Sequence, residues 1–147
     1  MKLWNKGKKL DALVDSFTIG NDQKLDLYLA EFDVLGTLAH IMMLENINLL
    51  SKEELLKLKN ELKNIHEQIK ENKFQIEEGI EDVHSQIELM LTKKLGDLGK
   101  KIHAGRSRND QVLVDIKLFI RSKITAIVEK TGLLFDILIN QSEKYKN

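Results

Sequence analysis

Hydrophobic residues recur along this chain at intervals of three and four, the spacing that places side chains on one face of an α-helix. Four segments show the pattern, at about 22–45, 51–69, 81–95 and 108–145. Period-two alternation is scarce and aromatic residues are few, so strand signals are weak. The pattern predicts an all-α fold.

The first segment has an apolar stripe on one predicted helix face, formed by Leu25, Leu29, Phe32, Gly36, Ala39 and Met43. Because Gly36 and Ala39 are small, we expect another helix to approach closely there.

The second and third segments carry start and stop signals. Ser51 and Glu54 fit a capping box before a stripe of leucines and isoleucines, namely Leu55, Leu58, Leu62, Ile65 and Ile69. The third segment begins near Glu81 and ends at Gly96, a typical C-terminal stop. The glycines of the following stretch, GDLGKKIHAG, predict a loop.

The fourth segment is too apolar for a surface helix. One seam holds Leu113, Ile120, Ile127 and Leu134, and neighbouring faces are apolar as well. A helix that is apolar around most of its circumference is normally buried on several sides. We therefore expect its partners in a continuation of the chain, in other subunits or in both, and the sequence has the character of an interrupted protein.

Composition narrows the classes of protein that fit. Lys plus Arg number 23 and Asp plus Glu number 23, so the formal net charge is zero, which argues against a general nucleic-acid or membrane-surface binder. Cysteine is absent, which fits a reducing cytoplasm. No signal peptide and no run of about 18 apolar residues is evident. Proline is absent too, so nothing of that kind interrupts long helices.

The start of the fourth segment has the residues of an anion site. Ser107 and Asp110 fit a second capping box, which places Arg108 and Asn109 in a first helical turn whose backbone N–H groups lack intrahelical partners. With Arg106 close by, this junction suits a carboxylate or phosphate. The alternative is a purely structural cap whose arginines are solvated or paired with acids of neighbouring helices.

The stretch EDVHSQIE, residues 81–88, is a second polar group. His84 and Glu88 lie one turn apart and could form an acid–base pair, but no third ligand for a metal site is evident. The alternative is a capped helix start with a half-buried, hydrogen-bonded histidine. His103 could be another anion contact or a satisfied loop residue, and His40 and His66 are expected to be structural or exposed.

Together the two stretches indicate a protein family more specifically than either stretch does alone. EDVHSQIE followed by GKKIHAGRSRNDQVLVD closely resembles the N-terminal part of the argininosuccinate lyases of the fumarase/aspartase superfamily. The resemblance extends over nearly the whole chain and includes Trp4, the stretch YLAEFDVLGTLAHIMML and the stretch LLSKEEL.

The resemblance implies a β-elimination that cleaves argininosuccinate to L-arginine and fumarate, in arginine biosynthesis, without a metal or an organic cofactor. It implies an N-terminal helical domain over residues 1–107 and the start of a central helical bundle over residues 108–147. The bundle would be completed in a homotetramer. The substrate-binding positions that it implies are Asn109, Arg108, Ser107, Arg106, His84 and Asp82.

Some family features are missing. The start WNKGKKL departs from the family's Trp-Gly-Gly-Arg-Phe, and the family's early substrate-binding serine falls on Gly20, whose role Thr18 or a backbone N–H could take over. The family's Thr-His pair and its loop with the catalytic serine would lie beyond Asn147. We therefore expect no catalytic residue in this chain. A short helical interaction protein or an anion-binding protein without catalysis stays the alternative.

Overall fold

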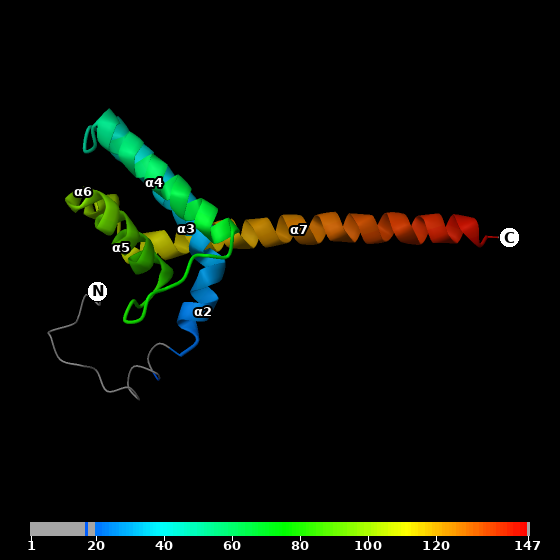
Figure 1. Cartoon of the computed structure of the whole chain (residues 1–147). Helices are drawn as coiled ribbons and strands as arrows, with labels where there is room; N and C mark the ends of the chain where they lie inside the picture. Colours follow the sequence, from blue (N-terminus) through cyan, green and yellow to red (C-terminus); the bar gives the residue numbers. More distant parts are fainter. Residues whose placement is uncertain (1–16, 18–19, 147) are drawn as a thin grey trace.

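The structure, a computed structural model, describes residue 17 and residues 20–146, and the part it describes is helical without a strand. This confirms the all-α prediction. Figure 1 shows a group of helices at one end and a single long helix that projects away from them. The expectations placed on Trp4, on the WNKGKKL start and on Thr18 lie outside the described residues.

The first predicted helix is divided into α2 (Asp22–Asp26), a 3-10 turn η1 (Leu27–Leu29) and α3 (Ala30–Asn46). The apolar stripe seen in the sequence is not the face that α3 buries in the core. The side chains buried on α3 are Ala30, Asp33, Val34, Thr37, Ile41 and Leu44, whereas Leu25 and Met43 of the predicted stripe are exposed. The physical reason is that α3 is apolar on several sides, so its hydrophobic pattern does not single out one face.

Helix α4 (Lys52–Lys70) matches its prediction closely. Ser51 accepts a hydrogen bond from the backbone N–H of Glu54, and the Glu54 carboxylate accepts one from the backbone N–H of Ser51, which completes the capping box. Leu58, Leu62 and Ile65 are buried and pack in one core with residues of α3 and α5.

Helix α5 (Val83–Leu95) starts at the N-cap Asp82 and ends at Gly96, whose φ of +62° favours glycine. The loop predicted after Gly96 is instead helical, with α6 (Asp97–Lys100) and a 3-10 turn η2 (Lys101–His103). Packing explains the difference. A Cβ on Gly99 would lie 2.5 Å from the backbone nitrogen of Thr92, so only glycine allows α6 to rest on the end of α5.

The long helix is α7 (Arg108–Lys144), with 37 residues and therefore a length of ~55 Å. Its first part packs on α3. A Cβ on Gly36 would lie 3.2 Å from the Asp115 carboxylate, and the rings of Phe32 and Phe119 meet edge to face at 5.8 Å. The expected close approach at Gly36 is therefore confirmed.

Many apolar side chains of α7 are exposed to solvent. The seam seen in the sequence is about half exposed along its length, with Leu113 at 54%, Ile120 at 48%, Ile127 at 63% and Leu134 at 56%. In Figure 1 the length of α7 beyond its contact with α3 has no neighbour among the described helices. The excess of apolar surface predicted from the sequence is present.

The run Gln23–Asn46 has the length and hydropathy of a membrane-spanning helix, by those two measures only. A core helix has the same properties. The packing of α3 against α4, α5 and α7 accounts for its apolar character in this fold.

Candidate functional site

The junction between the short turn η2 and α7 is built by local sequence. Ser107 accepts a hydrogen bond from the backbone N–H of Asp110 at 3.2 Å, and the Asp110 carboxylate accepts one from the backbone N–H of Ser107 at 3.0 Å. The second predicted capping box is therefore confirmed. Gly105 has a φ of +69°, a conformation that favours glycine and lets the chain turn into the helix.

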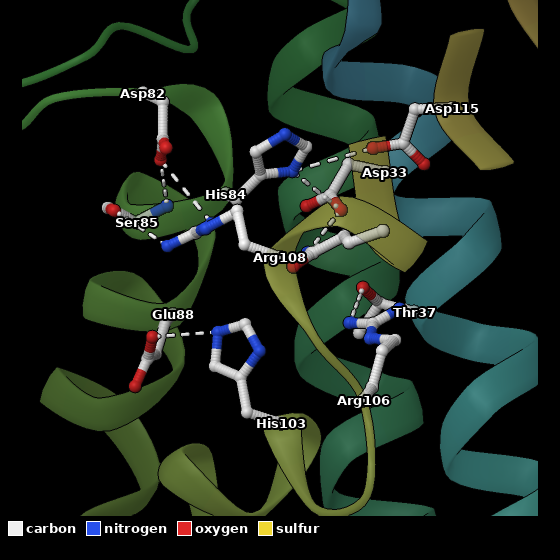
Figure 2. Close-up of polar contacts among 11 residues, drawn as sticks. Asp33, Thr37, Asp82, His84, Ser85, Glu88, His103, Arg106, Arg108 and Asp115 are labelled. Carbon is white, nitrogen blue, oxygen red and sulfur yellow. Dashed lines mark hydrogen bonds and ion pairs between the residues drawn. The ribbon is translucent and has the colours of Figure 1, made fainter. Parts of the chain in front are cut away.

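Arg108 reaches back to the start of α5. Its guanidinium donates to Ser85 Oγ at 3.1 Å and lies 3.4 Å from Asp82 Oδ1. The same Asp82 oxygen accepts the backbone N–H of Ser85 at 2.7 Å, which is the N-cap bond of α5. Asp82 thus holds a helix start and an arginine at once, as Figure 2 shows.

Arg106 points to α3 instead. Its guanidinium donates to Thr37 Oγ1 at 3.1 Å, and burial lowers the pKa of this arginine from its usual value. Both arginines are therefore held by the protein. Arg108 lies beside an acid of a neighbouring helix, as the structural alternative predicted, and keeps 29% of its side chain exposed, whereas Arg106 bonds a hydroxyl group.

Asn109 and Ser107 are exposed at the outer side of the junction. Asn109 lies in the first turn of α7, where the helix dipole and free backbone N–H groups favour an anion. An amide side chain there can both donate to and accept from a polar ligand. This is the part of the site that a solute can reach.

His84 lies inside the protein and is not half-buried as predicted. Its residue is only 2% exposed, and its Nδ1 lies 3.0 Å from Asp33 Oδ1 and 3.4 Å from Asp115 Oδ2. The suggested pair of His84 with Glu88 is not formed. Glu88 Oε2 contacts His103 Nε2 at 2.9 Å, and this contact holds the pKa of Glu88 below its usual value.

Two buried carboxylates lie beside His84, and their pKa values are shifted in opposite directions. Burial and, to a lesser extent, the neighbouring Asp33 carboxylate together raise the pKa of Asp115 to about 8, since two adjacent carboxylates resist ionising together. Burial acts on Asp33 in the same direction, but the contact with His84 and a hydrogen bond from Gln111 Nε2 at 2.5 Å hold its pKa below the usual value.

The sequence argument found no three ligands for a metal ion, whereas Asp33, His84 and Asp115 each offer a ligand atom within 4.8 Å of the others. The guanidinium of Arg106 faces both carboxylates, and its positive charge lowers the pKa of both acids. We therefore describe these residues as a buried polar cluster that is paired within the protein.

Two of the remaining histidines and a lysine tie the 97–106 segment to the helices around it. His40 Nε2 donates to the carbonyl of Ala104 at 3.0 Å, and Lys101 pairs with Glu54 at 2.5 Å. His103 is satisfied by Glu88, so of its two predicted roles the structural one is observed. His66 contacts Glu31 at 3.3 Å, in line with the prediction for it.

Sequence analysis missed Asp33, Thr37, Gln111 and Asp115. The signal that could have found Asp33 is its place in the otherwise apolar stretch FDVLG, because a charge inside a core helix requires a partner. Gln111 and Asp115 are spaced by one turn on α7, so they share a face.

The chain is similar to known proteins over nearly its whole length. A protein-family model described as lyase matches residues 5–147. A curated argininosuccinate lyase of Parabacteroides distasonis is 62% identical over 146 residues, and one of Bacteroides thetaiotaomicron is 59% identical over 146 residues. A more distant argininosuccinate lyase, of Methylococcus capsulatus, is 40% identical over 145 residues.

These matches cover nearly all of this chain but little of each relative. The Parabacteroides and Bacteroides matches extend over 99% of the chain and 33% of the relative, and the Methylococcus match over 97% of the chain and 31% of the relative. The chain thus spans about a third of the length of the curated relatives that it matches.

Proposed function

Since this chain belongs to the lyase family, we propose that it serves as the N-terminal part of an argininosuccinate lyase. The proposed reaction is the β-elimination that cleaves argininosuccinate to L-arginine and fumarate, in a cytoplasmic route of arginine biosynthesis. The observation that supports the proposal is the junction at Ser107–Asn109, where an exposed amide lies in a first helical turn, an arrangement suited to binding a carboxylate.

The chemistry of the reaction matches what this junction offers. A base removes a proton from the carbon beside a succinate carboxylate, the electron pair forms the new double bond, and the C–N bond breaks with arginine as the leaving group. Negative charge builds on the carboxylate before the bond breaks. Fixed N–H donors and a cation around that carboxylate stabilise the charge as it develops.

The six proposed site residues divide by exposure. Asn109 and the exposed part of Arg108 can contact a bound carboxylate, and Ser107 starts the helical turn that carries them. Asp82 holds Arg108, and the less exposed His84 and Arg106 lie behind the junction. Proton transfer requires further residues, and we assign these to the portion of the protein that corresponds to the other two thirds of the relatives. No cofactor is assigned.

We also propose a homotetramer. The apolar seam of α7 is continuous and about half exposed, and helices of other copies can bury it in a bundle. The competing function, an interaction protein without catalysis, draws on the same exposed seam.

A hybrid enzyme tests the proposal. Residues 1–147 replace the matching third of the Parabacteroides distasonis lyase, and fumarate release from argininosuccinate is followed by ultraviolet absorbance. We expect the hybrid to turn over and the 147-residue chain alone to be inactive. A hybrid that assembles and melts like the parent lyase, yet releases no fumarate, would contradict the proposed function.

A further inference from the structure

The buried cluster of Asp33, His84 and Asp115 is not needed for binding a carboxylate at the surface. These residues are 0%, 2% and 1% exposed, so none of them touches a ligand at the junction. Burying two carboxylates costs free energy, and well-packed apolar side chains of similar size often give equal or greater stability. The cluster therefore calls for an explanation other than stability alone.

Each member of the cluster has a close neighbour that holds part of the junction. Thr37, one turn along α3 from Asp33, accepts the hydrogen bond of Arg106. Ser85, next to His84 on α5, accepts that of Arg108.

The third member, Asp115, belongs to α7 itself. One turn before it, Gln111 donates to Asp33 across the helix interface. The cluster is thus linked to Arg106 through α3, to Arg108 through α5, and to α7 through Asp115 in the second turn of that helix. Figure 2 shows the labelled residues of this arrangement.

We propose that Asp115, together with Asp33 and His84, is a positioning group for Arg108 and Asn109. By fixing the first two turns of α7 against α3 and α5, the cluster sets where the donors of the junction stand relative to a carboxylate. This inference rests on the proposed function for its catalytic consequence, but the positioning itself can be measured on the chain alone.

Asp115 is the member of the cluster whose substitution should most disturb the packing of α7 on α3. Its Oδ1 lies where a Cβ on Gly36 would come within 3.2 Å, so α3 and α7 touch through this carboxyl group. Both of its oxygens lack a hydrogen bond within the described part of the chain. A change of charge or of space at this point moves α7 relative to α3.

A pH titration supplies a readout that packing alone would not give. The titratable or charged groups that face Asp115 are Asp33 from α3, His84 from α5 and Arg106 from the preceding turn. Because burial and Asp33 raise the pKa of Asp115 to about 8, the charge of the cluster changes in a range where exposed acids do not titrate.

The experiment follows the Arg108 Nε–H and Asn109 side-chain amide resonances by NMR in the deuterated, ¹⁵N-labelled chain from pH 6 to 9.5. Both resonances should shift with one common midpoint near the pKa of Asp115. Asp115→Asn should remove the inflection. Glu53→Gln, which removes an exposed ion pair with Lys57 on α4, is the matched control and should leave the curve intact.

Gly36→Ala is a second variant that tests the inference if Asp115→Asn fails to fold. It pushes on Asp115 without removing a charge, so both resonances should be displaced while their pH inflection persists. Resonances of Arg108 and Asn109 that are flat with pH in the parent chain, or that keep the inflection in Asp115→Asn, would overturn the inference.

The hybrid lyase adds the catalytic consequence. Asp115→Asn should lower kcat by up to about 10²-fold with little change in KM, because a small misplacement of binding groups mainly affects the transition state. Failure of the parent hybrid to turn over would count against the proposed function, and the NMR result would still decide the positioning. An unchanged kcat in an active Asp115→Asn hybrid would overturn the inference.

Discussion

At the residue scale, Ser107 and Asn109 are neighbours with opposite tasks. The Ser107 hydroxyl is engaged by the backbone N–H of Asp110 and the side chain of the same residue, so it serves the start of α7. Asn109 lies two residues further along the chain and is exposed to solvent. The start of α7 therefore depends on the serine, while the amide is left for a ligand.

Substitution of these two residues should separate stability from function. Ser107→Ala should lower the free energy of unfolding by about 0.5–2 kcal/mol because the cap is lost. Asn109→Ala should leave the melting temperature nearly unchanged and, in the hybrid lyase, lower kcat and kcat/KM together. Thermal melts and steady-state kinetics measure both effects. An Asn109→Ala protein that melts early but keeps full activity in its folded fraction would make the residue structural.

The buried acids predict an unusual dependence of stability on pH. Asp115 has a folded pKa raised from 3.8 to about 8, so between these values the folded state binds a proton that the unfolded state has lost. Its contribution to stability is therefore full below pH 3.8 and is lost as the pH rises toward 8. Asp33 acts oppositely, because its lowered pKa removes stability as the pH falls through its folded pKa.

Urea unfolding at pH 5 and pH 8 measures this effect. The parent chain should lose more stability between the two values than Asp115→Asn, which has no carboxyl group to titrate there. Equal losses in the two proteins would mean that Asp115 is ionised in the folded state at pH 5.

At the element scale, local signals predicted the helices well and their packing poorly. Both capping boxes, at Ser51 and at Ser107, are formed by residues three apart, so the sequence contains everything they need. The α6 turn was missed because its formation depends on contact between Gly99 and the end of α5, and not on its own propensity. Asp33 and Asp115 were missed because their contacts join α3, α5 and α7 across long stretches of sequence.

Gly99→Ala should disrupt the packing of α6 on α5. The added Cβ would come within 2.5 to 2.8 Å of the backbone at Leu91 and Thr92, which cannot move aside like a flexible side chain. We expect a loss of about 1–3 kcal/mol in the free energy of unfolding, measured by urea denaturation. The control is Gly132→Ala in α7, where no atom lies within 4 Å, and which should be neutral or slightly stabilising. Equal effects of the two substitutions would contradict the packing explanation.

At the scale of the whole molecule, the chain has two unlike parts. One is a packed group of helices with its own core, formed by α3, α4 and α5, and the other is the projecting length of α7. The exposed apolar side chains of α7 exceed the scattered apolar surface that is normal for a monomer.

The chain should therefore self-associate through α7. Sedimentation velocity over a concentration series should show a species larger than the 17.0 kDa monomer. Ile127→Lys with Leu134→Lys, two charges on the apolar seam, should shift the distribution toward monomer while the circular dichroism of the helical group persists. A parent chain that stays monomeric at high concentration and binds no hydrophobic dye would show that the seam needs no partner.

The position of α7 at the end of the described chain also bears on the order of folding. Helices α3, α4 and α5 precede it and share a core, so they can associate while a ribosome is still producing the residues that follow. The bond from Gln111 to Asp33 spans 78 positions and has to wait until α7 has been made. Until α7 has been made, Asp33 and His84 can contact each other, but Gln111 and Asp115 are not yet present. The proposed carboxylate site is thus among the last features of this region to form, and a nascent chain that stops before α7 has a core but lacks that proposed site.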